Sequence, residues 1–375
     1  MTRFTSHRST KMAAAWCCAL LSLTANAVPQ APPLGAPPGA PPMPPGAPPP
    51  GALPPGAPGG PGPGGSMPNF ATPAGPDTPM AAAHRAAAKE AAGTRWENAY
   101  GYLCAKSGRP NMPSDETIKP QWIFDNVAII GDRYTVMYVL KTSAGIMLID
   151  SGYSSKLDSV LLPSLSQLGI EPATVKYILI AHGHPDHFGG APYFQTHYGT
   201  RVVSSAADWD LMSGPPALLP PNPLPWMVAK GPTRDIVVGD GGEVVLGDTH
   251  VKAYLIPGHT PGALGFIFPV KDKGRTRTAA MFGGTILDPR LISTEGLQQY
   301  VKSLAHFGDV TRARKVDVEL QNHPVFDDMW MKTDALAALK TGASNPFVVG
   351  VPGYQSFLKV MSECTQATIA LRQGI

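Results

Sequence analysis

The sequence predicts an α+β domain in which helices cover mixed β-sheets. Two observations indicate this fold class. Short apolar runs rich in Val, Ile and Tyr alternate with longer segments that have helical periodicity. Some of these runs are separated only by turn residues, which is typical of hairpins, whereas others are separated by helical segments, which is typical of crossovers between strands.

The expected elements follow from these patterns in chain order. Three closely spaced strands come first, and a helix then leads to a buried strand. Gly247 and Asp248 separate two later strands and are a strong hairpin signal. The predicted strands are residues 127–130, 135–141, 145–150, 176–180, 201–204, 243–246, 250–256, 265–268 and 278–282. The predicted helices are residues 80–92, 157–168, 192–198, 294–307, 334–340 and 354–372.

Residues 1–27 are predicted to be a secretory signal peptide. Positive residues precede a short apolar run at residues 12–24, and residues 25–27 (Ala-Asn-Ala) have the small-x-small pattern of a cleavage site. The run is too short to span a bilayer comfortably. We therefore expect a periplasmic or secreted protein without stable membrane insertion. An amphipathic N-terminal helix and an uncleaved anchor are the alternatives.

The remaining chain divides by composition. The sequence holds 42 Pro and 40 Gly, and much of the Pro lies between residues 28 and 79. Such a segment cannot bury a core, so we interpret residues 28–90 as a Pro/Gly/Ala-rich linker and residues 91–375 as one hydrolase domain. The net charge of +3 does not favour nucleic acid or an anionic membrane surface as a partner. A small-molecule substrate is expected instead.

Two cysteines remain once the signal peptide is removed. Cys104 and Cys364 lie near the two ends of the predicted domain, and an exported pair is free to oxidise. They are therefore a disulfide candidate, with two buried thiols as the alternative. No Cys or His stands beside them at the spacing of metal ligands, which argues against a zinc site made from this pair.

The run YILIAHGHPDHFGG, at residues 177–190, is the most informative segment. An apolar strand leads directly into His182, His184, Asp186 and His187. On an extended loop His182 and His184 can converge on one metal ion, and Asp186 and His187 then point to a second. Imidazole and carboxylate are the nitrogen and oxygen donors that zinc accepts.

Two further histidines lie at predicted strand ends. His259 stands in the loop sequence PGHTPG, and His323 follows the apolar run at residues 316–320. A two-metal site needs more donors than one loop supplies, so we expect these two residues to complete it. The other five histidines lie in the predicted signal peptide, in predicted helices or beside a turn, and surface or packing roles are expected for them: His7, His84, His197, His250 and His306.

These motifs resemble those of the metallo-β-lactamase superfamily. AHGHPDHFGG resembles its signature loop, GIMLIDSG resembles the preceding strand with a supporting Asp, and IPGHTPG resembles the loop that carries a further metal ligand. The resemblance extends from about residue 124 to the end of the chain. It implies an αβ/βα four-layer sandwich with the metals at one edge.

Within the superfamily, the chain resembles the third subclass of class B β-lactamases. That resemblance implies two Zn²⁺ per chain. The implied ligands are His182, His184 and His259 for the first zinc, and Asp186, His187 and His323 for the second.

The segment MFGGTI, at residues 281–286, also bears on the subclass. Many other members of the superfamily carry a bridging Asp at this place, and this segment has no acidic residue. Thr285 stands where another lactamase subclass has a Cys ligand. Two residues depart from the lactamase pattern. Pro185 stands where small residues are commoner, and Asp288 stands where one subclass has a substrate-binding Lys. No clear cation for the substrate carboxylate is visible in the sequence, although Arg290 is nearby.

The leading interpretation is an exported β-lactamase that confers antibiotic resistance. Zinc-activated hydroxide would open the β-lactam amide. Asp186 would be both a ligand and the group that orients the nucleophile, while Thr285 and Tyr153 would donate hydrogen bonds to the substrate. One alternative is another hydrolase on this fold, such as a lactonase, thioesterase, phosphodiesterase or arylsulfatase-like enzyme. A non-catalytic, metal-binding envelope protein is the other.

Overall fold

The computed structural model describes residues 76–104, 116–214, 229–288 and 292–375. The predicted signal peptide and the predicted linker up to residue 75 lie outside the described residues, as does Arg290. The chain divides into two units, residues 1–52 and 53–375. All described residues belong to the second unit, which is considered by itself below.

The described strands form two sheets. In the first, of seven strands, neighbours follow chain order from β1 to β7. Along β3 to β6, buried side chains alternate between the two faces of the sheet. Strands β1 to β4 pair antiparallel, and β4 to β7 pair parallel. The strands are β1 (Gln121–Phe124), β2 (Val127–Gly131), β3 (Val136–Thr142), β4 (Gly145–Ile149), β5 (Val175–Leu179), β6 (Arg201–Ser204) and β7 (Ile236–Val237).

The second sheet has five described strands in the order β12-β11-β10-β9-β8. All pairs are antiparallel except β11 with β12. The predicted turn at Gly247 joins β8 to β9, and Gly247 has a φ of 57°, which glycine adopts without steric cost. The strands are β8 (Gly242–Leu246), β9 (Thr249–Leu255), β10 (Leu264–Asp272), β11 (Arg275–Phe282) and β12 (Val318–Leu320).

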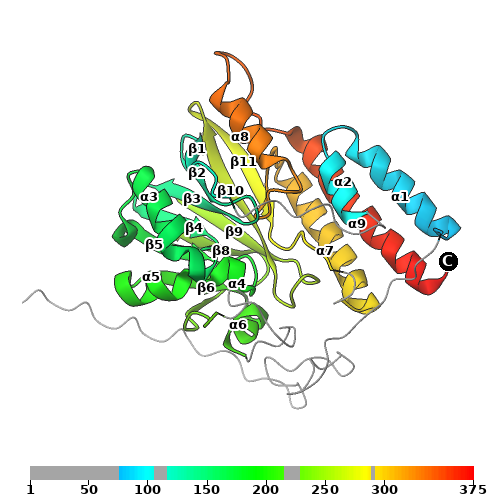
Figure 1. The fold of residues 1–375 in the computed structure, drawn as a ribbon, viewed down its shortest axis with the longest axis horizontal. Helices are drawn as coiled ribbons and strands as arrows, with labels where there is room; N and C mark the ends of the chain where they lie inside the picture. The colour runs from blue at the N-terminus through cyan, green and yellow to red at the C-terminus, as the bar shows by residue number, and fades with distance from the viewer. Residues whose placement is uncertain (1–75, 105–115, 215–228, 289–291) are drawn as a thin grey trace, which may run out of the picture. The chain divides into compact units, whose positions relative to one another are not determined.

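Helices cover the outer face of each sheet, as Figure 1 shows for α3 and α5 on one side and α7 and α9 on the other. On the first sheet lie η1 (Ser154–Lys156), η2 (Leu157–Leu161), α3 (Leu162–Gln167), η3 (Pro172–Thr174), α4 (Pro185–Phe188), α5 (Ala191–Tyr198) and α6 (Ala206–Ser213). The second sheet is covered by α7 (Thr294–Ala313) and α9 (Gly350–Gln373), and α1 (Pro79–Ala92) and α2 (Glu97–Leu103) pack on α9. Helix α8 (Met329–Ala337) contributes Met329 to the core between the sheets.

The hydrophobic core separates into layers that match this arrangement. Along β3, Tyr138 and Leu140 face the other sheet, whereas Met137 and Val139 face the helices. This alternation is the period of two that a strand imposes on its side chains. The predicted α+β class and the four-layer sandwich are therefore confirmed.

Helix α1 corrects the predicted linker boundary. Residues 79–90 form most of α1, which packs along α9 and buries Ala81 and Ala88 completely. Cys104, at the end of α2, forms a disulfide with Cys364 of α9, with the two Cα atoms 4.9 Å apart. The folded part thus begins before residue 91, and its N-terminal helices are fastened to its last helix.

Several other elements differ from the prediction. Helix α6 and strand β1 were not predicted, and β10 and β11 run on to a tight turn at Lys273 and Gly274. Helix α8 begins five residues earlier than expected. Its Lys332 is partly buried and pairs with the buried Glu319 and Asp327 at 3.0 and 2.7 Å. Because Lys332 interrupts the apolar pattern, the helix was predicted to begin too late in the chain.

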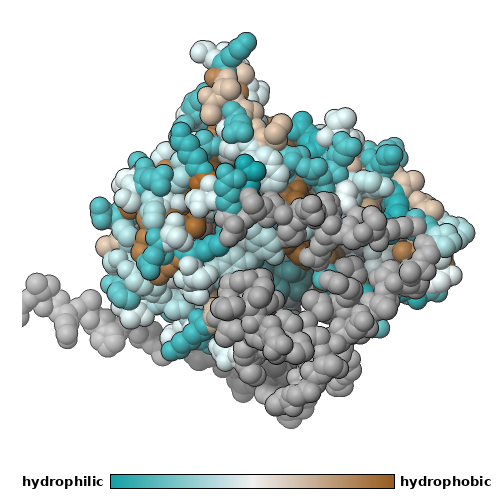
Figure 2. Space-filling view, in the orientation of Figure 1, coloured by the Kyte–Doolittle hydropathy of each residue, from teal (hydrophilic) through white to brown (hydrophobic). Residues whose placement is uncertain are grey.

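On the face in Figure 2, hydrophobic residues occur in small separate areas among hydrophilic ones. None of the described helices has the length and apolar character needed to cross a bilayer.

Candidate metal centre

The loop that follows β5 supplies four of the six predicted ligands. Backbone hydrogen bonds fix its start, since the Ala181 N–H donates to Asp150 Oδ1 at 2.7 Å and the Ala181 carbonyl accepts from the Leu264 N–H at 2.7 Å. Pro185 begins the short helix α4. Proline suits a first helical turn because its missing N–H would have no intrahelical partner there. The departure at Pro185 is therefore compatible with the loop geometry.

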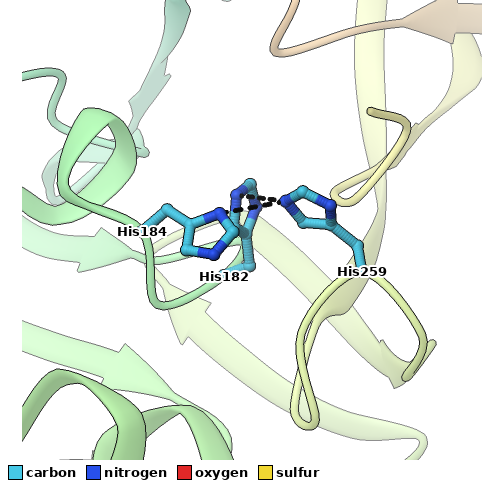
Figure 3. A group of neighbouring side chains, drawn as sticks. All are labelled: His182, His184 and His259. Carbon is cyan, nitrogen blue, oxygen red and sulfur yellow. Dashed lines mark hydrogen bonds between the residues drawn. The ribbon is translucent and has the colours of Figure 1, made fainter. Parts of the chain in front are cut away.

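Three histidines form the first group, shown in Figure 3. His182 and His184 come from the loop after β5, and His259 comes from the loop between β9 and β10. Nε2 of His259 lies 3.0 Å from Nε2 of His182 and 3.1 Å from Nδ1 of His184. The three nitrogens therefore converge on one point from two different loops.

Asp186, His187 and His323 form the second group. Nε2 of His187 lies 3.2 Å from Nε2 of His323 and 3.2 Å from Oδ2 of Asp186, and Oδ2 of Asp186 lies 3.8 Å from Nε2 of His323. Asp186 and His187 lie in α4, and His323 follows β12 of the other sheet. The structure thus assembles the six predicted ligands into the two predicted groups.

Buried oxygen atoms orient three of the rings. In each case Nδ1 donates a hydrogen bond: His182 to the Gly283 carbonyl at 2.5 Å, His187 to Asp150 Oδ2 at 2.7 Å, and His323 to the Tyr134 carbonyl at 2.8 Å. These bonds direct Nε2 towards the centre of each group, which is how proteins commonly orient metal-binding histidines. The supporting role predicted for Asp150 is visible here.

The donor set and its spacing fit zinc. A tetrahedral zinc ion with bonds to nitrogen of about 2.0–2.1 Å separates its ligand atoms by about 3.3 Å. The corresponding separations are 3.0 and 3.1 Å in the first group and 3.2 Å for the two nitrogens of the second. Three ligands in each group also leave a coordination position for water or substrate, as catalytic zinc sites do.

Burial and neighbouring charges shift the pKa values of these ligands. Burial lowers the pKa of His184 and of His323 to about 4, and it also lowers those of His182 and His259. Burial likewise opposes a charge on His187, but the Asp186 and Asp150 carboxylates outweigh it and raise its pKa to about 10. The first group is thus a set of neutral nitrogen donors. The second pairs the Asp186 carboxylate with a protonated His187, which must release its proton when a metal binds.

The two predicted substrate contacts have different surroundings. Thr285 is fully buried, and its hydroxyl donates to Gln321 Oε1 at 2.6 Å. The hydroxyl has no exposed surface in this structure, and a substrate contact by Thr285 stays a prediction. Tyr153 is 7% exposed and lies beside Tyr134, whose ring packs edge-on against His323.

The histidines expected outside the site lie outside it wherever the structure describes them. Each of these histidines contacts a group outside the two metal groups: His84 contacts Glu363, His197 the Tyr193 carbonyl, His250 Glu243 and His306 Asp240. His7 lies outside the described residues.

Sequence reasoning missed three residues that hold the ligands in place. Asp208 of α6 hydrogen-bonds both loops of the first group, Thr135 donates to Asp186 Oδ2 at 3.4 Å, and Asn322 donates to Asp150 Oδ2 at 3.2 Å. Only Asn322, beside His323, stands next to a predicted ligand. Ser205 followed three residues later by an acidic residue is a helix-start signal that could have revealed α6.

The comparisons with known proteins agree with this geometry. Residues 130–272 match the family described as the metallo-β-lactamase superfamily. BJP-1, a subclass B3 metallo-β-lactamase of Bradyrhizobium japonicum, is similar over 69% of this chain and 93% of its own, with 26% identity and a TM-score of 0.54. Residues 130–272 of this chain belong to the metallo-β-lactamase superfamily.

Other members of the metallo-β-lactamase superfamily give the same fold. Native FEZ-1 metallo-β-lactamase from Legionella gormanii has 22% identity over 65% of this chain and 93% of its own, with a TM-score of 0.55, which supports the fold alone. Among curated proteins, a probable metallo-hydrolase of Burkholderia pseudomallei is 28% identical over 34% of this chain, and a hydroxyacylglutathione hydrolase of Haemophilus influenzae is 32% identical over 29%. These matches span 42% and 52% of the two relatives.

The described residues hold an intact His triad and an intact Asp-His-His site, the donor groups of a metallo-hydrolase of this superfamily. The predicted family and enzyme class are therefore confirmed.

Proposed function

We propose that this chain is an exported, binuclear zinc β-lactamase. The observation that carries the proposal is the separation of its ligands into a His triad and an Asp-His-His group, with no acidic residue between them. The segment at residues 281–286, which resembles the place where many superfamily members carry a bridging Asp, has no acidic residue and contains two glycines. A Cβ at Gly283 would clash with the Leu264 carbonyl and lie 2.8 Å from the Ala181 Cβ, while a Cβ at Gly284 would lie 2.7 Å from the His259 Cβ.

The residues of the two groups would have different roles in hydrolysis. His182, His184 and His259 would hold one zinc ion, and Asp186, His187 and His323 the other. When bound, the two ions would supply an activated water and polarise the substrate carbonyl. Asp186 is both a ligand and a hydrogen-bond acceptor, so it would orient the attacking water.

Tyr153 is our candidate substrate contact. Burial and the nearby Asp186 carboxylate raise the pKa of its hydroxyl well above the usual value. The phenol therefore stays protonated at neutral pH and can donate a hydrogen bond to substrate oxygen as negative charge develops there.

Export is part of the proposal. A disulfide joins Cys104 to Cys364. Disulfides form and persist in oxidising compartments and are rare in the cytosol. With the signal-like residues 1–27, this bond supports a periplasmic or secreted location.

The test is hydrolysis of a carbapenem and a chromogenic cephalosporin by the purified chain. We expect turnover that a chelator abolishes and added zinc restores. The control is His250→Ala, which removes an exposed histidine outside the site and should leave turnover unchanged. A protein that holds two zinc ions per chain but hydrolyses neither compound would contradict the β-lactamase proposal.

A thioester hydrolase is the second candidate. Several curated relatives are hydroxyacylglutathione hydrolases, at 27–32% identity. An S-acylglutathione assayed beside the β-lactams distinguishes the two functions, because one of the two substrates should be preferred by a large factor in kcat/KM.

A further inference from the structure

One buried carboxylate touches both loops that carry the first metal group. Asp208 lies in the first turn of α6, has no exposed surface and belongs to neither ligand group. Its backbone N–H donates to the Ser205 side chain at 3.2 Å, which caps the helix and fixes where the carboxylate points. A helix that begins at this place therefore aims one carboxylate at the metal-binding loops.

Each oxygen of Asp208 accepts hydrogen bonds from these loops. Oδ2 accepts from the Gly183 N–H at 2.8 Å and from the Thr260 hydroxyl at 2.7 Å, and Oδ1 accepts from the Gly262 N–H at 2.8 Å. Gly183 lies between His182 and His184. Thr260 and Gly262 follow His259. Three hydrogen bonds from a single side chain therefore connect the two loops whose histidines converge.

The two glycines are needed for this close approach. A Cβ at Gly262 would lie 2.7 Å from the Asp208 backbone nitrogen, and a Cβ at Gly183 would lie 3.0 Å from the Leu211 side chain. Larger residues would therefore push α6 away from one loop or the other. The sequence thus provides both the acceptor and the space that the contact requires.

No lysine, arginine or histidine of the described chain forms an ion pair with Asp208. Its charge is stabilised by the three hydrogen bonds alone. Burial raises the pKa of Asp208 to about 6, against the effect of those bonds. A buried carboxylate without a counter-ion costs free energy, so its presence calls for a role that a neutral side chain would not fill.

The second metal group has different supports. His187 depends on Asp150, and His323 depends on the Tyr134 carbonyl. Tyr134 and Thr135 follow Asp132, whose Oδ1 accepts from the backbone N–H of both at 2.8 Å. None of these contacts involves Asp208, whose side-chain hydrogen bonds all go to the two loops of the first group. Asn322 joins the supports of the two groups, because it donates both to Asp150 Oδ2 and to the Gly283 carbonyl that orients His182.

We propose that Asp208 is a positioning residue for the first metal site alone, because it fixes the distance between the His182–His184 loop and the His259 loop. The proposal rests on the binuclear site described above and goes beyond it by assigning the first metal a support of its own. Loss of the Asp208 carboxylate should weaken one metal and spare the other.

The test compares Asp208→Asn with Asp210→Asn. The first change keeps the shape of the side chain but turns one acceptor oxygen into a donor that faces a backbone N–H. The second makes the same chemical change two residues away, at an exposed carboxylate paired with Arg234 at 2.5 Å. Metal content per chain and competition with a chromophoric chelator are measured for the zinc-loaded proteins.

We expect wild type and Asp210→Asn to bind two zinc ions with matching affinities. Asp208→Asn should lose affinity for one ion by about 10–100-fold, as changes to groups that orient ligands typically do. Adding His259→Ala to Asp208→Asn should then cost little more metal, whereas adding His323→Ala should remove most of the remaining ion. The electronic spectrum of the cobalt-substituted protein should change only in the bands of the weakened site.

Thr260→Val serves as a milder variant if Asp208→Asn does not fold. It removes one of the three hydrogen bonds and should weaken the same ion by a smaller factor. Unchanged affinity for both ions, or equal loss of both, would overturn the assignment of Asp208. A wild-type protein that binds no zinc would instead overturn the proposed binuclear site itself, so the two failures are distinguishable.

Discussion

The backbone of Asp150 adopts a left-handed conformation, with a φ of 62°. This region is uncommon for residues other than glycine. In return, the carboxylate at the end of β4 reaches both the Ala181 N–H and Nδ1 of His187, each at 2.7 Å. Strained residues of this kind persist where their surroundings fix them, and they cluster at functional sites. At the scale of single residues, Asp150 thus connects the start of the metal loop to one of its ligands.

Thr285→Val tests whether the Thr285 hydroxyl stabilises the fold or contacts the substrate. The change removes a buried hydroxyl and leaves Gln321 Oε1 without that donor, so the free energy of unfolding should fall by about 1–3 kcal/mol. KM and kcat for the substrate should change less than about threefold, since the hydroxyl has no exposed surface. The comparison variant is Tyr153→Phe, which should lower kcat/KM by about tenfold with little change in stability. A large loss of kcat/KM in Thr285→Val at unchanged stability would restore the substrate contact first predicted.

At the scale of elements, the turn between β2 and β3 supports the second metal group. Asp132 accepts the backbone N–H groups of Tyr134 and Thr135 and pairs with Lys156 at 2.6 Å. The turn then presents the Tyr134 carbonyl to His323 and the Thr135 hydroxyl to Asp186. A short connection between two strands therefore positions two of the three ligands in that group.

The disulfide joins α2 to α9, away from the metal groups. Its loss should therefore lower the stability of the fold and leave metal binding unchanged. The disulfide closes a loop of 260 residues between α2 and α9. Cross-links over long loops restrict the unfolded chain, so the double variant Cys104→Ser with Cys364→Ser should lose about 2–5 kcal/mol in urea denaturation. Zinc content and KM should stay at wild-type values, because neither cysteine belongs to a ligand group or its hydrogen-bond network. Loss of zinc in this variant, at a temperature where it remains folded, would contradict that separation.

At the scale of the whole described domain, the metal groups lie where the two sheets meet. In each group, ligands from the loop after β5 in the first sheet are joined by one histidine that follows a strand of the second sheet, His259 after β9 and His323 after β12. A bound ion would therefore connect the two halves of the sandwich.

Metal removal should accordingly destabilise the domain. Ligands that bind only the folded state stabilise it by about 4 kcal/mol at a free concentration 1,000 times the dissociation constant. For a domain of this size we expect the chelated protein to unfold about 10 °C below the zinc-loaded one in calorimetry. Zinc should restore the higher temperature, whereas magnesium, which prefers oxygen ligands, should not. Equal unfolding temperatures with and without zinc would show that the ions do not connect the sheets.

Some features could be predicted because they depend on neighbours in the chain. The apolar run at residues 135–141 predicted a strand, and the Gly247–Asp248 turn predicted a hairpin. Other boundaries depend on distant contacts. The start of α8 depends on Lys332 meeting Glu319 of β12, and the folding of residues 79–90 depends on α9, more than 260 positions later.

The sequence by itself determined the fold class and the identity of the six ligands, because strand ends, turn residues and the HxHxDH spacing are local patterns. Only the tertiary structure decided how those ligands are held. Asp208 meets Gly183 and Gly262 across 25 and 54 positions, and Thr285 is buried by Gln321 across 36. Such contacts depend on the packing of the two sheets and α6, and no local pattern of residues encodes the distances that this packing sets.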